Sequence, residues 1–158
     1  RLAFETARVL RARGKALPRH LYAAGAPAPQ LPPPNRAWHH LPQDALLAEL
    51  RRYNGLPREL LDEPELLAYF LPALRADLRM IETAVYHPEP PFDFTISALG
   101  GNRDPLVSVK ELEAWQNQTS GRLRLVLFDG DHFFPHAAQT AVLDHIINET
   151  RTEPTSDV

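Results

Sequence analysis

The most informative stretch of the chain reads Phe94-Thr95-Ile96-Ser97-Ala98-Leu99-Gly100-Gly101-Asn102-Arg103-Asp104-Pro105. An apolar and β-branched run that ends at two glycines is typical of a buried strand followed by a tight turn. An acidic residue, Asp104, comes directly after that turn. The sequence therefore predicts a strand over residues 94–99 with a carboxylate just beyond its carboxyl end.

A second stretch, residues 123–134, repeats this design. Its first six residues are mostly apolar and predict another strand, and the loop that follows carries Asp129, Gly130, Asp131 and His132. In open α/β sheets, catalytic groups gather beyond the carboxyl ends of the strands, and α/β-hydrolases place their acid before their histidine along the chain. We therefore expect His132 to act as a general base, with Asp104 holding its imidazole in the required tautomer.

Each loop also has a simpler interpretation when it is taken alone. A Gly-Gly-x-x-Asp turn is often only a turn in which the carboxylate caps its own backbone, and a histidine after a strand is often a surface residue. His132 and His136 stand at i, i+4 spacing beside Asp129 and Asp131, so a metal site is a further alternative. These alternatives stay open at this point. His39 and His40 lie in a predicted loop, where we expect them at the surface rather than as ligands.

The flanking sequence predicts an α/β fold made of parallel strands with flanking helices and an inserted helical lid. A helical pattern from Leu2 to Gly14 precedes a short apolar run at 21–24, which is the rhythm of a parallel α/β sheet. Residues 43–86 read as several short helices, with an interruption at Pro72. Ser108 and Glu111 form a capping box, and a last helix starts near Pro135. We assign residues 1–42 and 87–150 to the core, 43–86 to the lid and 151–158 to a polar tail.

The composition excludes several classes of function. The chain has 158 residues, a net charge of −3 and no cysteine. This charge gives no basic surface for nucleic acid or an anionic membrane, and no apolar run is long enough to cross a bilayer. The absence of cysteine rules out disulfides and thiol catalysis, and it suits a reducing cytoplasm.

The residues also resemble a known family, the type II thioesterases of nonribosomal peptide and polyketide synthesis, within the α/β-hydrolase superfamily. The most distinctive match is Gly130-Asp131-His132-Phe133-Phe134. The similar segments span almost the whole chain, and they are residues 1–5, 22–29, 71–83, 100–105, Trp115 and 130–134. The segment 71–83 is similar to the lid helix of the family.

The resemblance implies an activity and a partner. Asp104 would be the acid and His132 the base of a Ser-Asp-His triad, and helices within 43–86 would cover the acyl chamber. The enzyme would remove aberrant acyl groups from acyl or peptidyl carrier proteins that bear acyl-phosphopantetheine. It would use no metal and no cofactor, and it would act as a cytoplasmic monomer.

One element of the family pattern is missing from these 158 residues, the Gly-x-Ser-x-Gly nucleophile elbow. By the match of the first helix, the serine would lie about four residues before Arg1. Ser97 falls within a strand, Ser108 caps a helix and Ser120 precedes a turn glycine, so we reject all three as substitutes. Two alternatives remain: a product-releasing thioesterase domain within a synthetase, and a non-catalytic remnant that binds carrier proteins.

Overall fold

A computed structural model describes residues 1–34, 36–53, 55–56 and 63–152. The chain divides into two compact units. The larger unit consists of residues 2–28 and 90–158, and the smaller of Arg1 and residues 29–89. The smaller unit is wider than the expected lid of 43–86, since residues 29–42 group with the helices that follow them.

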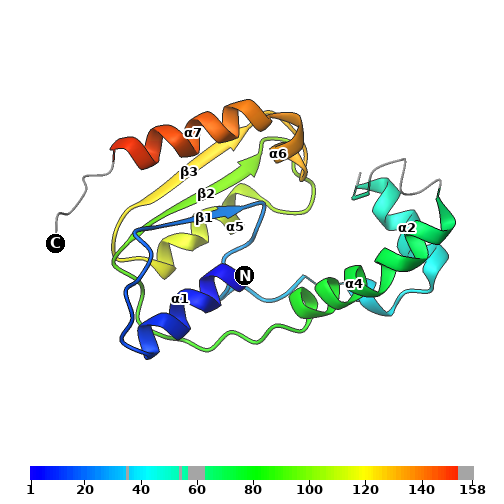
Figure 1. Ribbon diagram of the computed structural model, residues 1–158, viewed down its shortest axis with the longest axis horizontal. Helices are drawn as coiled ribbons and strands as arrows, with labels where there is room; N and C mark the ends of the chain where they lie inside the picture. The colour runs from blue at the N-terminus through cyan, green and yellow to red at the C-terminus, as the bar shows by residue number, and fades with distance from the viewer. Residues whose placement is uncertain (35, 54, 57–62, 153–158) are drawn as a thin grey trace. The chain divides into compact units, whose positions relative to one another are not determined.

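The larger unit is built on a parallel sheet with the strand order β1-β2-β3 (Figure 1). The strands are β1 (His20–Ala24), β2 (Thr95–Gly101) and β3 (Leu123–Phe128). In the central strand, Ile96 aligns with Leu21 on one side and with Leu123 on the other. The predicted α/β class is therefore confirmed, and the carboxyl ends of all three strands lie at one edge.

Helices cover both faces of this sheet, as Figure 1 shows. Helix α7 (Gln139–Thr152) lies on one face, where Val142 packs with Leu99. Helices α1 (Leu2–Ala12) and α5 (Val109–Glu113) lie on the other. A short 3-10 helix, Ala114–Gln118, follows α5. The alternation of side chains along β2 explains the two layers, because consecutive residues of a strand point to opposite faces.

The start of α5 matches its prediction, whereas the last helix differs from its prediction. The capping box of Ser108 and Glu111 is confirmed at the start of α5. The last helix is instead divided into α6 (Phe134–Ala137) and α7, because Ala138 leaves the helical conformation. Helix α7 runs to Thr152, and the rest of the predicted tail lies outside the described residues.

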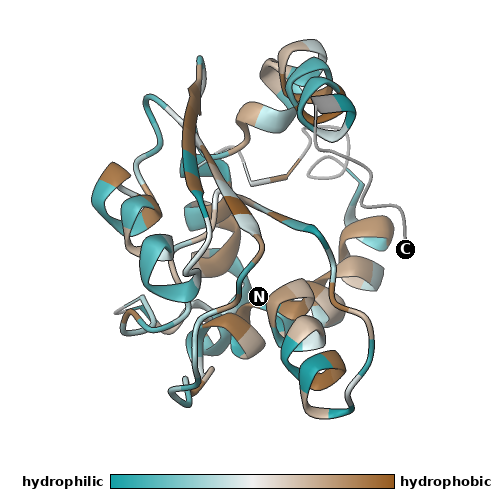
Figure 2. Ribbon diagram, turned by 90° about the vertical axis from the view of Figure 1, so that its left-hand side faces the viewer, coloured by the Kyte–Doolittle hydropathy of each residue, from teal (hydrophilic) through white to brown (hydrophobic). Residues whose placement is uncertain are grey.

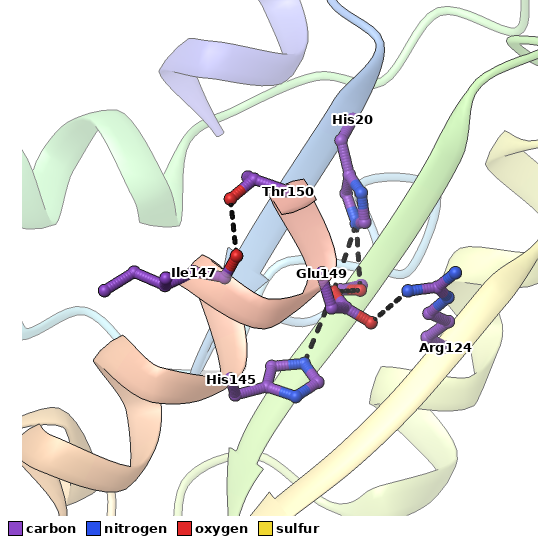
Figure 3. Close-up of polar contacts among 7 residues, drawn as sticks. His20, Arg124, His145, Ile147, Glu149 and Thr150 are labelled. Atoms are coloured by element: carbon purple, nitrogen blue, oxygen red, sulfur yellow. Dashed lines mark hydrogen bonds and ion pairs between the residues drawn. The ribbon is translucent and has the colours of Figure 1, made fainter. Parts of the chain in front are cut away.

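A buried carboxylate ties α7 to the sheet (Figure 3). One oxygen of Glu149 accepts a hydrogen bond from the Ser97 hydroxyl at 2.9 Å, and the other binds the Arg124 guanidinium. The rings of His145 and His20 lie 3.3 and 3.6 Å from the same carboxylate. Burial by itself would raise the pKa of Glu149, but the hydrogen bonds from Arg124 and Ser97 and the charges of His145 and Arg124 outweigh it and hold the pKa below its ordinary value.

We expect Glu149→Gln to lower the free energy of unfolding by about 3 kcal/mol at pH 7, because it leaves Arg124 without its buried counter-charge. The lowered pKa means that the contribution of Glu149 is complete above about pH 5 and is lost as the pH falls through the folded-state pKa. Urea denaturation at about pH 7 and at about pH 3.5 measures both effects. The exposed Asp144→Asn change on the same helix is the control. An equal loss for the two variants at neutral pH would contradict this role.

The smaller unit is helical. It contains a 3-10 helix (Trp38–His40), α2 (Gln43–Arg52) and α4 (Pro64–Glu82). Its core consists of leucines on the facing sides of α2 and α4, namely Leu46, Leu47, Leu50, Leu67 and Leu71. Figure 2 shows that the helices of the chain carry both hydrophobic and hydrophilic residues, as their amphipathic patterns predict.

Two predictions for this unit were wrong. Pro72 does not interrupt the helix but lies inside α4. Packing of the neighbouring Leu71 in the core offsets the free-energy cost of the hydrogen bond that proline cannot make. Of the two histidines expected at the surface, His40 is exposed, but the side chain of His39 is only 10% exposed and its ring binds the buried carboxylate of Glu82. Glu82 also accepts the backbone N–H groups of Trp38 and His39. None of the described helices combines the length and hydropathy needed to span a membrane.

Candidate active site

Asp104 lies in the turn after β2 and is held from two directions. Its Oδ1 atom accepts the backbone N–H groups of Leu106 at 2.7 Å and Val107 at 3.1 Å. Its Oδ2 atom lies 2.9 Å from Nδ1 of His132. The side chain is 1% exposed, so water cannot compete for these contacts. The carboxylate therefore caps its own turn, as the simpler interpretation held, and still presents one oxygen to the histidine.

His132 lies in the loop between β3 and α6, and its side chain is 25% exposed. A carboxylate can only accept a hydrogen bond, so the neutral imidazole carries its proton on Nδ1 and has a lone pair on Nε2. In the described part of the chain, no hydrogen-bond partner occupies that second nitrogen. The ring of Phe133 packs edge-on against the imidazole with centroids 5.2 Å apart. This geometry suits a base that accepts a proton at Nε2.

The loops that carry Asp104 and His132 are in direct backbone contact. The N–H of Arg103 donates to the carbonyl of Gly130 at 3.0 Å, and the N–H of Asn102 donates to that of Phe128 at 2.9 Å. A Cβ atom added to Gly101 would lie 2.2 Å from the carbonyl oxygen of Asp131. Only glycine allows so close an approach, so the second glycine of the predicted turn is needed for contact between the loops.

An exposed ion pair lies beside the site. The guanidinium of Arg103 binds the carboxylate of Asp129, and both side chains are more than half exposed, at 65% and 75%. The pKa of the Asp129 carboxyl is lowered, first by the hydrogen bond from Arg103 and then by the hydrogen bond from Asn102 and the charge of Arg103. The bond to Asp129 likewise raises the pKa of Arg103. Asp129 therefore stays ionised next to the histidine loop over the physiological pH range.

A chain of short contacts connects the start of α1 to the edge of the sheet where His132 lies. In the first turn of α1, Phe4 packs edge-on against Trp115 with ring centroids 5.6 Å apart. The indole N–H of Trp115 donates to the carbonyl of Ala26 at 2.8 Å, just after β1. The preceding residue, Gly25, has a φ of +56°, and a Cβ atom there would lie 3.4 Å from Cε1 of His132.

The three serines rejected as nucleophiles are all engaged elsewhere. Ser97 is fully buried and its hydroxyl lies 2.9 Å from both the His20 ring and the Glu149 carboxylate, a combination of residue types that resembles a triad. No substrate can reach a hydroxyl with 0% exposure, so this combination is structural. Ser108 bonds to Glu111 in the capping box, and the hydroxyl of Ser120 donates to a backbone carbonyl.

The structure also bears on the metal alternative. His136 is exposed on α6, whereas His132 faces Asp104. Among the described residues, no group of three or more His, Cys, Asp or Glu side chains has the arrangement of a metal site. The two residues that the structure brings together at this edge are a histidine and a carboxylate, 2.9 Å apart.

The chain is similar to known proteins along most of its length. The family model described as "Thioesterase domain" matches residues 1–150. The chain is 41% identical over 145 residues to "Linear gramicidin dehydrogenase LgrE" of Brevibacillus parabrevis, covering 90% of this chain and 55% of that protein. It is 38% identical over 161 residues to "Thioesterase PikA5" of Streptomyces venezuelae, with coverages of 99% and 57%.

Solved structures show the same likeness. The thioesterase RedJ from the prodiginine biosynthetic pathway of Streptomyces coelicolor superposes with a TM-score of 0.80 at 37% identity. The match covers 92% of this chain and 56% of RedJ. The chain thus spans a little over half the length of these relatives.

Proposed function

The chain belongs to the thioesterase domain family of α/β-hydrolases, and on this premise we propose that it supplies the acid and the base of a type II editing thioesterase. Its substrates would be aberrant acyl groups bound as thioesters to the phosphopantetheine of acyl or peptidyl carrier proteins. The observation that carries the proposal is the 2.9 Å contact of Asp104 with Nδ1 of His132, which leaves Nε2 open at the carboxyl edge of the sheet. Relatives named "Gramicidin S biosynthesis protein GrsT" and "Probable cadicidin biosynthesis thioesterase" support the substrate class.

The reaction would proceed in two steps. In the first, Nε2 of His132 takes the proton of a serine hydroxyl, the serine oxygen attacks the thioester carbonyl, and the proton passes to the departing thiol. In the second, His132 takes a proton from water, hydroxide attacks the acyl-serine, and the serine regains its proton. Asp104 stabilises the imidazolium in both steps and keeps its own charge.

The serine would come from residues that precede Arg1, in a strand-to-helix turn that leads into α1. A chain of contacts in the larger unit supports this. The first turn of α1 is tied through Phe4, Trp115 and Ala26 to the edge where His132 lies. The backbone N–H after the serine would then contribute to the oxyanion hole.

A groove beside β1 also supports an upstream segment. Within the described residues, β1 pairs with β2 on one side only. An apolar groove of about 840 Å³ runs next to it, between α1 and the start of β1, lined by residues such as Leu2, Leu10, Leu17 and Leu21. Leu2 is 71% exposed. A further parallel strand, paired with β1, would cover such apolar surface and deliver the serine at the carboxyl edge.

The helices of the smaller unit would form the lid over the acyl group. Helix α4 exposes several large apolar side chains, with Tyr69 79% exposed and Leu66, Phe70, Met80 and Ile81 each exposed by almost half. Apolar patches of this kind mark sites that meet a ligand or a partner. We assign them to the acyl chain and to the mouth that admits the phosphopantetheine arm, with the protein acting as a monomer.

We expect residues 1–158 alone to show no turnover of acetyl-loaded carrier protein, because they hold the base without its nucleophile. A chain extended upstream through the serine turn should hydrolyse the same substrate. Release of acetate from the carrier protein, followed by mass spectrometry, measures both. Efficient hydrolysis by residues 1–158 alone would refute the assignment of the nucleophile. An extended chain that binds carrier protein without hydrolysing it would favour the non-catalytic alternative.

A further inference from the structure

Asn102 uses both ends of its side chain to join the two loops of the candidate site. Its Oδ1 atom accepts the backbone N–H of Gly130 at 3.2 Å. Its Nδ2 atom donates to the carboxylate of Asp129, also at 3.2 Å. The backbone N–H of Asn102 donates in addition to the carbonyl of Phe128. One residue of the acid loop therefore contacts the last residue of β3 and the first two residues of the histidine loop.

These contacts lie close in sequence to both Asp104 and His132. Asn102 lies two residues before Asp104, and Gly130 lies two residues before His132. Gly130 has a φ of +150°, a conformation that side-chain-bearing residues rarely adopt, so the loop bends at this point. The hydrogen bond to the Gly130 N–H fixes the bend relative to the acid loop. The spacing between the imidazole and the Asp104 carboxylate depends on the same bend.

We propose that Asn102 is a positioning residue that holds His132 within hydrogen-bonding distance of Asp104. Its effect on turnover rests on the proposed function, whereas its effect on the imidazole does not. An amide suits this place better than an acid, because it donates to a carboxylate with one end and accepts a backbone N–H with the other. A carboxylate in place of this amide would face the ionised Asp129 and repel it.

The chain offers a matched control in Arg103. Its guanidinium binds the same carboxylate of Asp129, but its side chain makes no hydrogen bond to the backbone of the histidine loop within the described residues. If Asn102 acted only by pairing with Asp129, Arg103→Ala would have a similar effect. If Asn102 acts by fixing the loop at Gly130, Arg103→Ala leaves the histidine unchanged. A double change, N102D with D129N, exchanges the amide and the acid and restores a complementary pair.

The first experiment measures solvent exchange of the His132 Nδ1–H proton by NMR in the 158-residue chain with ¹⁵N-labelled histidine. Loss of the hydrogen bond to the Gly130 N–H in Asn102→Ala, and repulsion between the carboxylates of residues 102 and 129 in Asn102→Asp, should each speed this exchange by about tenfold. The N102D/D129N double variant should return to the wild-type rate, and Arg103→Ala should not depart from it. Wild-type exchange in both single Asn102 variants, or an equal effect of Arg103→Ala, would overturn the proposal.

The second experiment uses the chain extended upstream and the acetyl-loaded carrier protein. We expect Asn102→Ala to lower kcat by about tenfold and to leave KM unchanged, since the imidazole is misplaced while the acyl and carrier contacts remain. The two experiments together distinguish an error in the proposed function from an error in the positioning role of Asn102. An inactive extended chain whose exchange rates follow the expected pattern would refute the proposed function alone. An active one in which Asn102→Ala changes neither exchange nor kcat would refute the positioning role alone.

Discussion

Replacing His132 with Ala in the upstream-extended protein is expected to lower kcat for hydrolysis of acetyl-loaded carrier protein by about 10⁵-fold or more. The reason is that no other described side chain stands at Nε2 to take the serine proton and return it to the thiol. KM should change little, because His132 contributes to the transition state rather than to binding of the carrier protein. Initial rates at saturating and at limiting substrate separate the two constants.

The matched control for this change is His136→Ala. His136 is exposed on α6, four residues after His132, so its loss removes an imidazole from the same region without touching the site. Its kcat should stay within about twofold of the wild type. Retained hydrolysis by the His132 variant would remove that residue from the mechanism. An equal loss of kcat in both variants would mean that any change in this region lowers activity, and it would contradict a specific role for His132.

Asp104→Asn is expected to lower kcat by about 10⁴-fold at neutral pH. The amide oxygen can still accept the N–H groups of Leu106 and Val107, so the turn should keep its shape. The amide nitrogen then faces Nδ1 of His132 as a donor, which places the imidazole proton on Nε2. In that tautomer His132 has no lone pair for the serine proton. Protein NMR of the imidazole nitrogens checks the tautomer, and kinetics check the loss.

The exposed Asp93→Asn change controls for the general effect of removing a carboxylate from this unit, and its activity should match the wild type. A normal rate in Asp104→Asn would show that the orienting carboxylate is not needed. A slow Asp104→Asn enzyme whose imidazole keeps its proton on Nδ1 would mean that the loss has a cause other than the tautomer.

Much of the larger unit could be predicted from local patterns. The strand at 123–128 and the capping box at Ser108 are confirmed with their predicted residues, because apolar runs and caps are decided by neighbours in sequence. Parallel strands bring their carboxyl ends to one edge, which is why the sequence predicts that Asp104 and His132 meet. Their 2.9 Å contact agrees with that expectation. Their roles in catalysis remain proposals.

Features that depend on distant partners could not be predicted in the same way. The side chain of His39 is largely covered because Glu82, far along the chain, accepts its backbone N–H and binds Nδ1 of its ring. Pro72 stays inside a helix because the helix packs in a leucine core that no local pattern describes. In the sequence, Asn102 is one residue of a predicted turn. Its partners lie in the next loop, so only the three-dimensional structure identifies it as a bridge.

In the proposed mechanism this chain provides the acid and the base, and the nucleophilic serine lies outside it. The direct measurement is to quench the extended enzyme during turnover of acetyl-loaded carrier protein and to locate the acetyl group by peptide mass spectrometry. We predict an acetylated serine before Arg1 in the wild type and its loss in His132→Ala. An acetyl group on Ser97, Ser108, Ser120 or any other residue of 1–158, or unchanged acetylation in His132→Ala, would contradict the account.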